Sequence, residues 1–136
     1  MTAAEARKLF AGARVARLAT VGATGRPHLV PIVFALDGDV VFSAVDAKPK
    51  RTTALKRLEN IAANPRVALL ADHYDEDWDA LWWARADGVA RVASDADARR
   101  GLALLARRYE QYRAAPPRGP VIAVAVERWS GWRARG

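Results

Sequence analysis

The residues best suited to chemistry in this 136-residue chain form a basic cluster where a predicted strand gives way to a predicted helix. The apolar run Val40–Val45 comes first, and the basic residues that follow it are Lys48, Lys50, Arg51 and Arg57, together with Lys56. Acidic residues are normally favoured in the first turn of a helix, because the helix dipole places positive partial charge there. A bound phosphate would offset this unfavourable arrangement, since it is attracted both by the dipole and by the basic side chains.

The alternative interpretation is that the basic cluster is only a solvated loop followed by an exposed helix face. No glycine-rich loop surrounds the lysines, so the stretch is not a P-loop. On these residues alone, both the anion-site hypothesis and the solvated-surface hypothesis stay open.

Most other kinds of catalytic site are excluded by composition. The chain has no cysteine, which removes disulfides, thiolate catalysis and Cys-ligated zinc. His28 and His73 are its two histidines, and neither has a partner at ligand spacing, so we expect no bound metal. The acidic stretch His73–Asp79 lacks the periodic ligands and the glycine of a calcium loop and is typical of a charged surface loop. So few histidines also argue against a Ser–His–Asp triad.

The tryptophans form a second group of interest, made up of Trp78, Trp82 and Trp83, with Trp129 and Trp132 later in the chain. Such residues usually belong to a core or a dimer interface. The alternative is that they wall a pocket for a flat ring, with Trp78 as a candidate ring contact. Together with an anion site, this pattern favours a phosphorylated, ring-bearing ligand, so that a cofactor carries the chemistry and the protein holds it.

The elements that would position these residues alternate between strand and helix patterns. The predicted helices are Thr2–Ala11, Thr52–Ala63 and a segment capped by Ser94; the predicted strands are Arg14–Val21, His28–Leu36, Val40–Val45, Arg66–Asp72, Leu81–Ser94 and Val121–Trp129. Pro31 cannot donate a ladder hydrogen bond, so its strand needs a bulge or an unpaired side. Gly88 marks a kink or turn in its long strand. Hairpin-joined strands, about six of them, suggest a small antiparallel barrel.

Length and composition set the remaining expectations. With 51% hydrophobic residues, the chain suits a single domain spanning residues 1–136. No apolar run approaches the roughly 18 to 20 residues that span a bilayer, and the N-terminus lacks an apolar signal core, so we expect a cytoplasmic protein without a membrane partner. The net charge of +7 suits an anionic partner. The arginines are scattered among acids, so nucleic acid is not the expected partner. A nucleic-acid-binding function would instead predict an affinity for DNA that falls steeply with salt.

Three stretches together resemble the pyridoxamine 5′-phosphate oxidase-like family of split β-barrel flavin and deazaflavin binders. They are RLATVGATGRPHLVPIVFAL, VVFSAVDAKPKRTTALKRLENIAANPRVALLAD and DWDALWWARADGVARV, and they occur in the family's order. More narrowly, the chain resembles the actinobacterial branch of F420-dependent enzymes in this family.

The resemblance implies a mainly β, α+β fold: a small antiparallel split β-barrel of the FMN-binding type with flanking helices. It also implies a homodimer with cofactor clefts between the subunits. The family's ring site lies on its second and third strands, which here correspond to Pro31, Ile32, Val33 and Ser43. The family's phosphate-holding residues match the region of Lys48, Lys50 and Arg51, with Arg57 as a further candidate.

Two departures from the family pattern shape the expected chemistry. The strand reads HLVPIVF where pyridoxamine phosphate oxidases carry an Arg-x-x-x-Leu-Lys-like pattern, and the chain ends in ERWSGWRARG instead of an Arg-rich substrate motif. We therefore expect an oxidoreductase that uses reduced coenzyme F420, with FMN as the alternative cofactor. Its substrate would be a small, flat, hydrophobic molecule such as an enone or quinone, and the sequence nominates no catalytic side chain. The alternative function is non-catalytic binding of flavin, F420 or haem.

Overall fold

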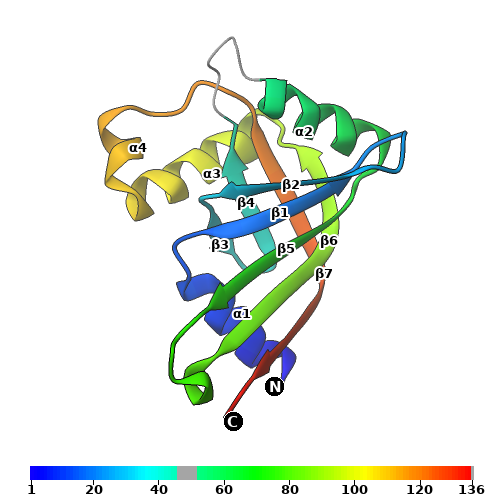
Figure 1. Ribbon diagram of the computed structural model, residues 1–136. Helices are drawn as coiled ribbons and strands as arrows, with labels where there is room; N and C mark the ends of the chain where they lie inside the picture. The colour runs from blue at the N-terminus through cyan, green and yellow to red at the C-terminus, as the bar shows by residue number, and fades with distance from the viewer. Residues whose placement is uncertain (46–51, 136) are drawn as a thin grey trace.

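The computed structural model of the protein describes residues 1–45 and 52–135. Within these residues, seven strands form one antiparallel sheet in the order β2-β1-β5-β6-β7-β4-β3. The strands are β1 (Ala16–Val21), β2 (Pro27–Ile32), β3 (Ala35–Asp37), β4 (Val40–Ala44), β5 (Arg66–His73), β6 (Trp82–Val92) and β7 (Val121–Arg133). The helices are α1 (Ala3–Gly12), α2 (Thr52–Ala63), α3 (Asp95–Arg108) and α4 (Glu110–Ala114), with a 3₁₀ turn at Trp78–Ala80. The sheet curls with helices around it (Figure 1), which confirms the predicted split β-barrel.

The strand predicted over His28–Leu36 is divided in the structure. β2 pairs with β1, whereas β3 pairs with β4 at the other edge of the sheet, and Val33 and Phe34 lie between them outside any ladder. This division accounts for a seventh strand where about six were expected. The prediction for Pro31 is confirmed: β2 is an edge strand, so the strand has an unpaired side.

The kink predicted at Gly88 is a bulge within a continuous strand. The register between β6 and β7 shifts between Asp87 and Gly88. A Cβ atom at Gly88 would lie 2.4 Å from the carbonyl oxygen of Ala125, so the close approach of the two backbones requires glycine there.

The interior of the sheet is filled from two sides by α1 and α2. Phe10 of α1 is fully buried, with its ring centroid 4.7 Å from that of Phe34 and 5.3 Å from that of Trp129. Asn60 of α2 donates a buried hydrogen bond of 3.0 Å from Nδ2 to Oγ1 of Thr20 on β1. These contacts fix both helices on the curled sheet. No helix among the described residues is long and apolar enough to cross a membrane.

The helix α3 packs against the opposite face of β4 and β7, and Gly101 makes this close approach possible. A Cβ atom at Gly101 would lie 2.7 Å from Cδ1 of Phe42, which is itself buried. We expect Gly101→Ala to lower the free energy of unfolding by about 1 kcal/mol, because an overpacking cost of about 1–3 kcal/mol exceeds a gain in helix propensity of about 1 kcal/mol.

Thermal or denaturant unfolding measures this effect of Gly101→Ala. Gly12→Ala is the matched control, because a Cβ atom there meets nothing within 4 Å. A Gly101→Ala variant at least as stable as the unsubstituted protein would contradict the packing argument.

Candidate functional site

Arg57 is the basic residue of the predicted anion site that the structure describes. Its side chain is half-buried, and its Nε atom is buried without a hydrogen-bond partner in the described part of the chain. Burial lowers the pKa of the Arg57 guanidinium, while the nearby Tyr112 of α4 raises it. An arginine stays charged at neutral pH, and a buried, unpaired N–H group of a cation is a place where an anion can bind.

Val33 and Ala44 form an apolar wall that is linked to this cation through Tyr112. Both are partly buried and pack on a small core of Ala35, Leu105 and Tyr109, and Tyr112 packs on the same core. Tyr112 thus interacts electrostatically with Arg57 and also packs on the core that supports the wall. A guanidinium at the edge of an apolar wall fits a ligand that carries both a ring and a phosphate.

The other predicted ring contacts differ in their accessibility. Pro31 is exposed on β2, so its ring can contact a ligand. Ile32 is only 6% exposed and belongs to the core. Ser43 is buried, and its Oγ donates a 3.0 Å hydrogen bond to the carbonyl oxygen of Val33. Ser43 therefore supports Val33 of the wall by this hydrogen bond, whereas Ile32 packs in the main core.

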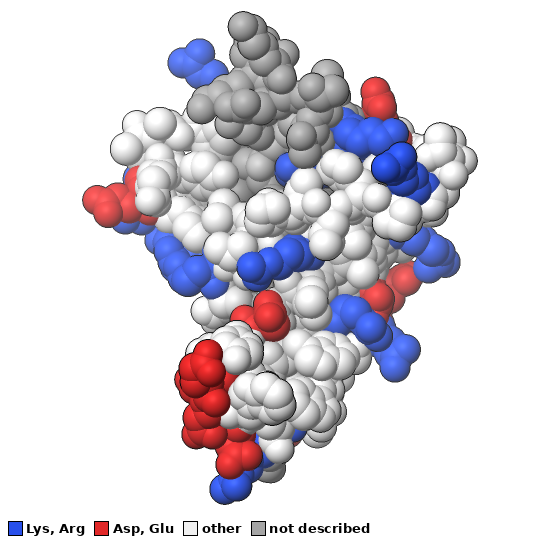
Figure 2. Space-filling model, in the orientation of Figure 1, with Lys and Arg blue, Asp and Glu red and all other residues white. Residues whose placement is uncertain are grey.

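Of the remaining predicted residues, three lie outside the described residues and Trp78 lies elsewhere. Lys48, Lys50 and Arg51 lie outside the described residues. Trp78 is 67% exposed in the 3₁₀ turn between β5 and β6. That turn lies at the bottom of Figure 1, at the opposite end of the molecule from α2. In Figure 2 acidic side chains gather at this end, where the sequence places Asp75, Glu76, Asp77 and Asp79.

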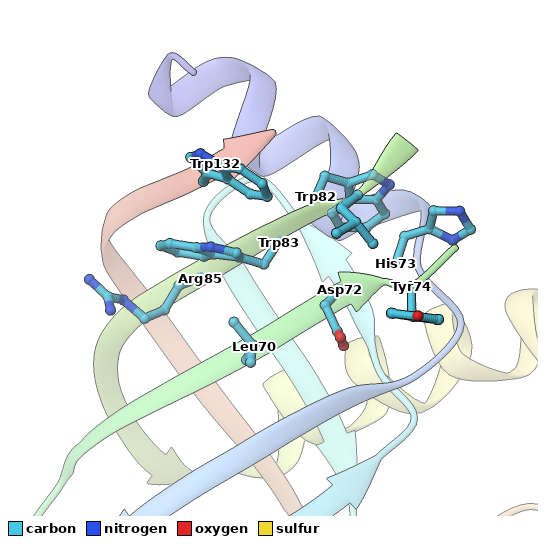
Figure 3. Close-up of a pocket in the computed structure, with 9 residues that line it drawn as sticks. Leu70, Asp72, His73, Tyr74, Trp82, Trp83, Arg85 and Trp132 are labelled. Atoms are coloured by element: carbon cyan, nitrogen blue, oxygen red, sulfur yellow. The ribbon is translucent and has the colours of Figure 1, made fainter. Parts of the chain in front are cut away.

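A cavity of about 420 Å³ lies on the sheet face between β5, β6 and β7 (Figure 3). Its lining residues are Leu70, Asp72, His73, Tyr74, Leu81, Trp82, Trp83, Arg85 and Trp132. Trp83 pairs with Trp132 across β6 and β7, and the rings of His73 and Trp82 stack with centroids 6.3 Å apart. Three of the predicted tryptophans, Trp82, Trp83 and Trp132, thus wall a pocket, whereas Trp129 packs on the core and does not line it.

A second cavity of about 500 Å³ adjoins the first and shares Leu70, Asp72 and Arg85 with it. It extends across β1 to Leu29 of β2, which is 67% exposed. We call the combined surface from Leu29 through Leu70 to Trp132 the outer-face groove. Its charged groups are paired: Arg17 lies 3.4 Å from Asp72, and Arg85 lies 3.1 Å from Asp87.

The sequence analysis did not predict the outer-face groove, although one sequence pattern indicates it. Leu69 and Leu70 are adjacent apolar residues in β5; Leu69 is 1% exposed and Leu70 is 37% exposed. Since neighbouring residues of a strand point to opposite faces, such a pair indicates a strand that is apolar on both faces.

Comparison with known families and structures agrees with this fold. A family model described as "Pyridoxamine 5′-phosphate oxidase" matches residues 2–133. A FAD-binding protein from Mesorhizobium loti has a similar structure, with a TM-score of 0.73, 20% identity, and coverage of 96% of this chain and 94% of that one. A conserved hypothetical protein from Mycobacterium tuberculosis gives a TM-score of 0.77 at 24% identity over 99% of this chain and 86% of that one.

The haem storage protein HutZ from Vibrio cholerae is also similar, with a TM-score of 0.73 and 16% identity over 96% of this chain and 92% of that one. At these identities the structural likeness establishes the fold. No curated protein sequence matches the chain.

Proposed function

The chain belongs to the pyridoxamine 5′-phosphate oxidase family, and on this premise we propose that it is an oxidoreductase that uses reduced coenzyme F420. The observation that carries this proposal is the half-buried Arg57, whose Nε has no partner among the described residues, and which is linked through Tyr112 to the apolar wall of Val33 and Ala44. Arg57 would hold the cofactor phosphate together with the basic residues of the preceding loop, and Pro31 and Val33 would contact the ring.

When bound, the reduced deazaflavin supplies a hydride to an electrophilic carbon of a small organic substrate. The chain's own residues have other tasks: Arg57 neutralises negative charge, and the wall around Val33 orients a ring and excludes water from one of its faces. An apolar wall of this kind favours a flat, hydrophobic substrate such as an enone or quinone.

The choice of F420 over FMN rests on the distribution of charge. F420 carries an acidic tail beyond its phosphate, whereas FMN ends at the phosphate. Lys56 is exposed next to Arg57 on α2, and Arg66 is exposed at the start of β5, 3.6 Å from Glu127. These cations would extend positive potential beyond the phosphate position. The outward residues of β2, Leu29 and Pro31, bring no charge suited to FMN.

We expect F420 to bind at least about tenfold more tightly than FMN, a difference of about 1.4 kcal/mol. Added salt should narrow this difference, because contacts to an exposed acidic tail are screened. Equilibrium titration of both cofactors, followed by absorbance and fluorescence at low and high salt, measures it. Equal or tighter FMN binding at low salt would contradict the F420 proposal and favour FMN as the cofactor.

A second candidate function is non-catalytic binding or carriage of flavin, F420 or haem. It is favoured by the likeness to a haem storage protein and by His73, an exposed imidazole on the aromatic cavity that could serve as an axial ligand. Incubation with reduced F420 and a panel of activated alkenes and quinones separates the two functions. Cofactor binding without oxidation of the cofactor would support the carrier.

We also propose that the protein acts as a homodimer and that the outer-face groove is its interface. The groove places exposed Leu29, Leu70 and Trp132 on one side of the sheet, where a second copy would cover them. A two-fold axis is the commonest arrangement for such self-association. The pairing of Arg17 with Asp72 and of Arg85 with Asp87 reduces the cost of burying the charges within this surface.

A further inference from the structure

The backbone between β2 and β3 obtains its hydrogen bonds from side chains instead of a neighbouring strand. The carbonyl oxygen of Val33 accepts a 3.0 Å bond from Ser43 Oγ. The amide of Phe34 donates to Oη of Tyr109 at 3.3 Å. The carbonyl oxygen of Phe34 lies 3.0 Å from Tyr109 Oη and accepts a 3.0 Å bond from an Arg108 guanidinium nitrogen. The Val33 carbonyl and both polar backbone groups of Phe34 therefore depend on side chains for their hydrogen bonds.

Tyr109 is the centre of this arrangement. It lies between α3 and α4, is 6% exposed, and its Oη also lies 2.9 Å from the carbonyl oxygen of Arg14. The guanidinium of Arg108 reaches the carbonyl oxygen of Ala13 and lies 5.4 Å from the Tyr109 ring centroid, and that of Arg14 lies 4.6 Å from it. The junction of α3 and α4 is thus bonded to two separate connecting segments of the barrel.

We propose that Tyr109 is a positioning residue for the cofactor: by holding the Phe34 backbone, it sets the place of Val33 in the apolar wall. This inference rests on the proposed function, since Val33 is a ring contact only if a cofactor binds there. Tyr109 does not touch the ligand itself. It acts through Phe34 and through the small core that also supports Ala44 and Tyr112.

A purely structural role for Tyr109 would predict something different. Loss of its hydroxyl would then lower the free energy of unfolding and leave cofactor affinity unchanged at temperatures where the protein is folded. A positioning role predicts that loss of the hydroxyl weakens cofactor binding more than another substitution that lowers the free energy of unfolding by the same amount. The two roles are therefore distinguished by comparing affinity at matched stability.

The test uses Tyr109→Phe, which keeps the ring and its packing and removes only the hydroxyl. We expect the dissociation constant for F420 to rise about tenfold, because the buried Phe34 amide loses its partner and the wall shifts. Amide hydrogen exchange at Phe34, measured by NMR, should become faster. Val67→Ala is the control: Val67 is a buried core residue of β5, and its truncation should lower the melting temperature without changing F420 affinity by more than about twofold.

Three other outcomes would overturn the inference. One is unchanged F420 affinity in Tyr109→Phe, and another is an equal loss of affinity in Val67→Ala. In either case tighter binding of F420 than of FMN by the unsubstituted protein would leave the proposed use of F420 standing. The third is failure of the unsubstituted protein to bind F420, which would contradict the proposed function and the inference together.

Discussion

Replacing Arg57 by glutamate is expected to weaken cofactor binding by about 100-fold, since a charge-assisted hydrogen bond worth about 1.5–3 kcal/mol is lost and a repulsive charge takes its place. The half-buried guanidinium has no hydrogen-bond partner for Nε in the described chain, so the phosphate would lose its buried contact. Thermal melts run beside the titrations separate loss of binding from loss of folding, because burial at this position disfavours the new carboxylate as it does the guanidinium.

Lys56→Glu is the matched control for Arg57→Glu. It makes the same change of charge one residue earlier on α2, at an exposed side chain. If Arg57 acts by contact, Lys56→Glu should weaken F420 binding only a fewfold and lose that effect at high salt, because exposed charges are screened. Equal effects of the two substitutions on F420 binding in fluorescence titrations would show that Arg57 acts only through long-range charge.

The sequence predicted most helices and strands because their signals are local. The helix α2 was predicted at the residues where it is found, from the helical spacing of Leu58 and Ile61 and the stop at Asn64. The break at Val33 and Phe34 was not predicted, since these residues continue an apolar run. The hydrogen bonds that allow the break come from Tyr109, 75 residues later in the chain than Phe34, and no local pattern indicates such a partner.

The predictions for the candidate site were limited in the same way, because local sequence patterns do not show which residues come together. Trp78 was grouped with Trp82 and Trp83 because they are close in sequence, yet the 3₁₀ turn leaves Trp78 exposed while the other two line the aromatic cavity. Ser43 was predicted to contact the ring, and within one chain its hydroxyl is bonded to Val33. Residue type indicates which side chains suit a cofactor, but the face on which each one lies depends on the register of the sheet.

Leu70→Glu is expected to raise the dissociation constant of the proposed homodimer by at least about 100-fold. Desolvation of a carboxylate in an interface costs several kcal/mol, and a two-fold dimer buries one carboxylate from each subunit. Leu70 lines both cavities of the outer-face groove and pairs with Arg17 on β1 and with Arg85 on β6. Those two cations flank the new carboxylate in the separated monomer, so the folded monomer should tolerate the substitution.

Light scattering across a range of micromolar concentrations measures the effect of Leu70→Glu, with Val92→Glu as its control. Val92 is 53% exposed and lines neither cavity, so the same change of charge there should leave the dimer intact. If the cofactor clefts lie between subunits, F420 affinity should fall together with dimer content in Leu70→Glu and recover at higher protein concentration.

An unsubstituted protein that is monomeric while it binds F420 would refute the dimer proposal. An intact Leu70→Glu dimer would instead place the interface on another face, since a carboxylate at the centre of the groove could not be buried there without a large loss of affinity between the subunits.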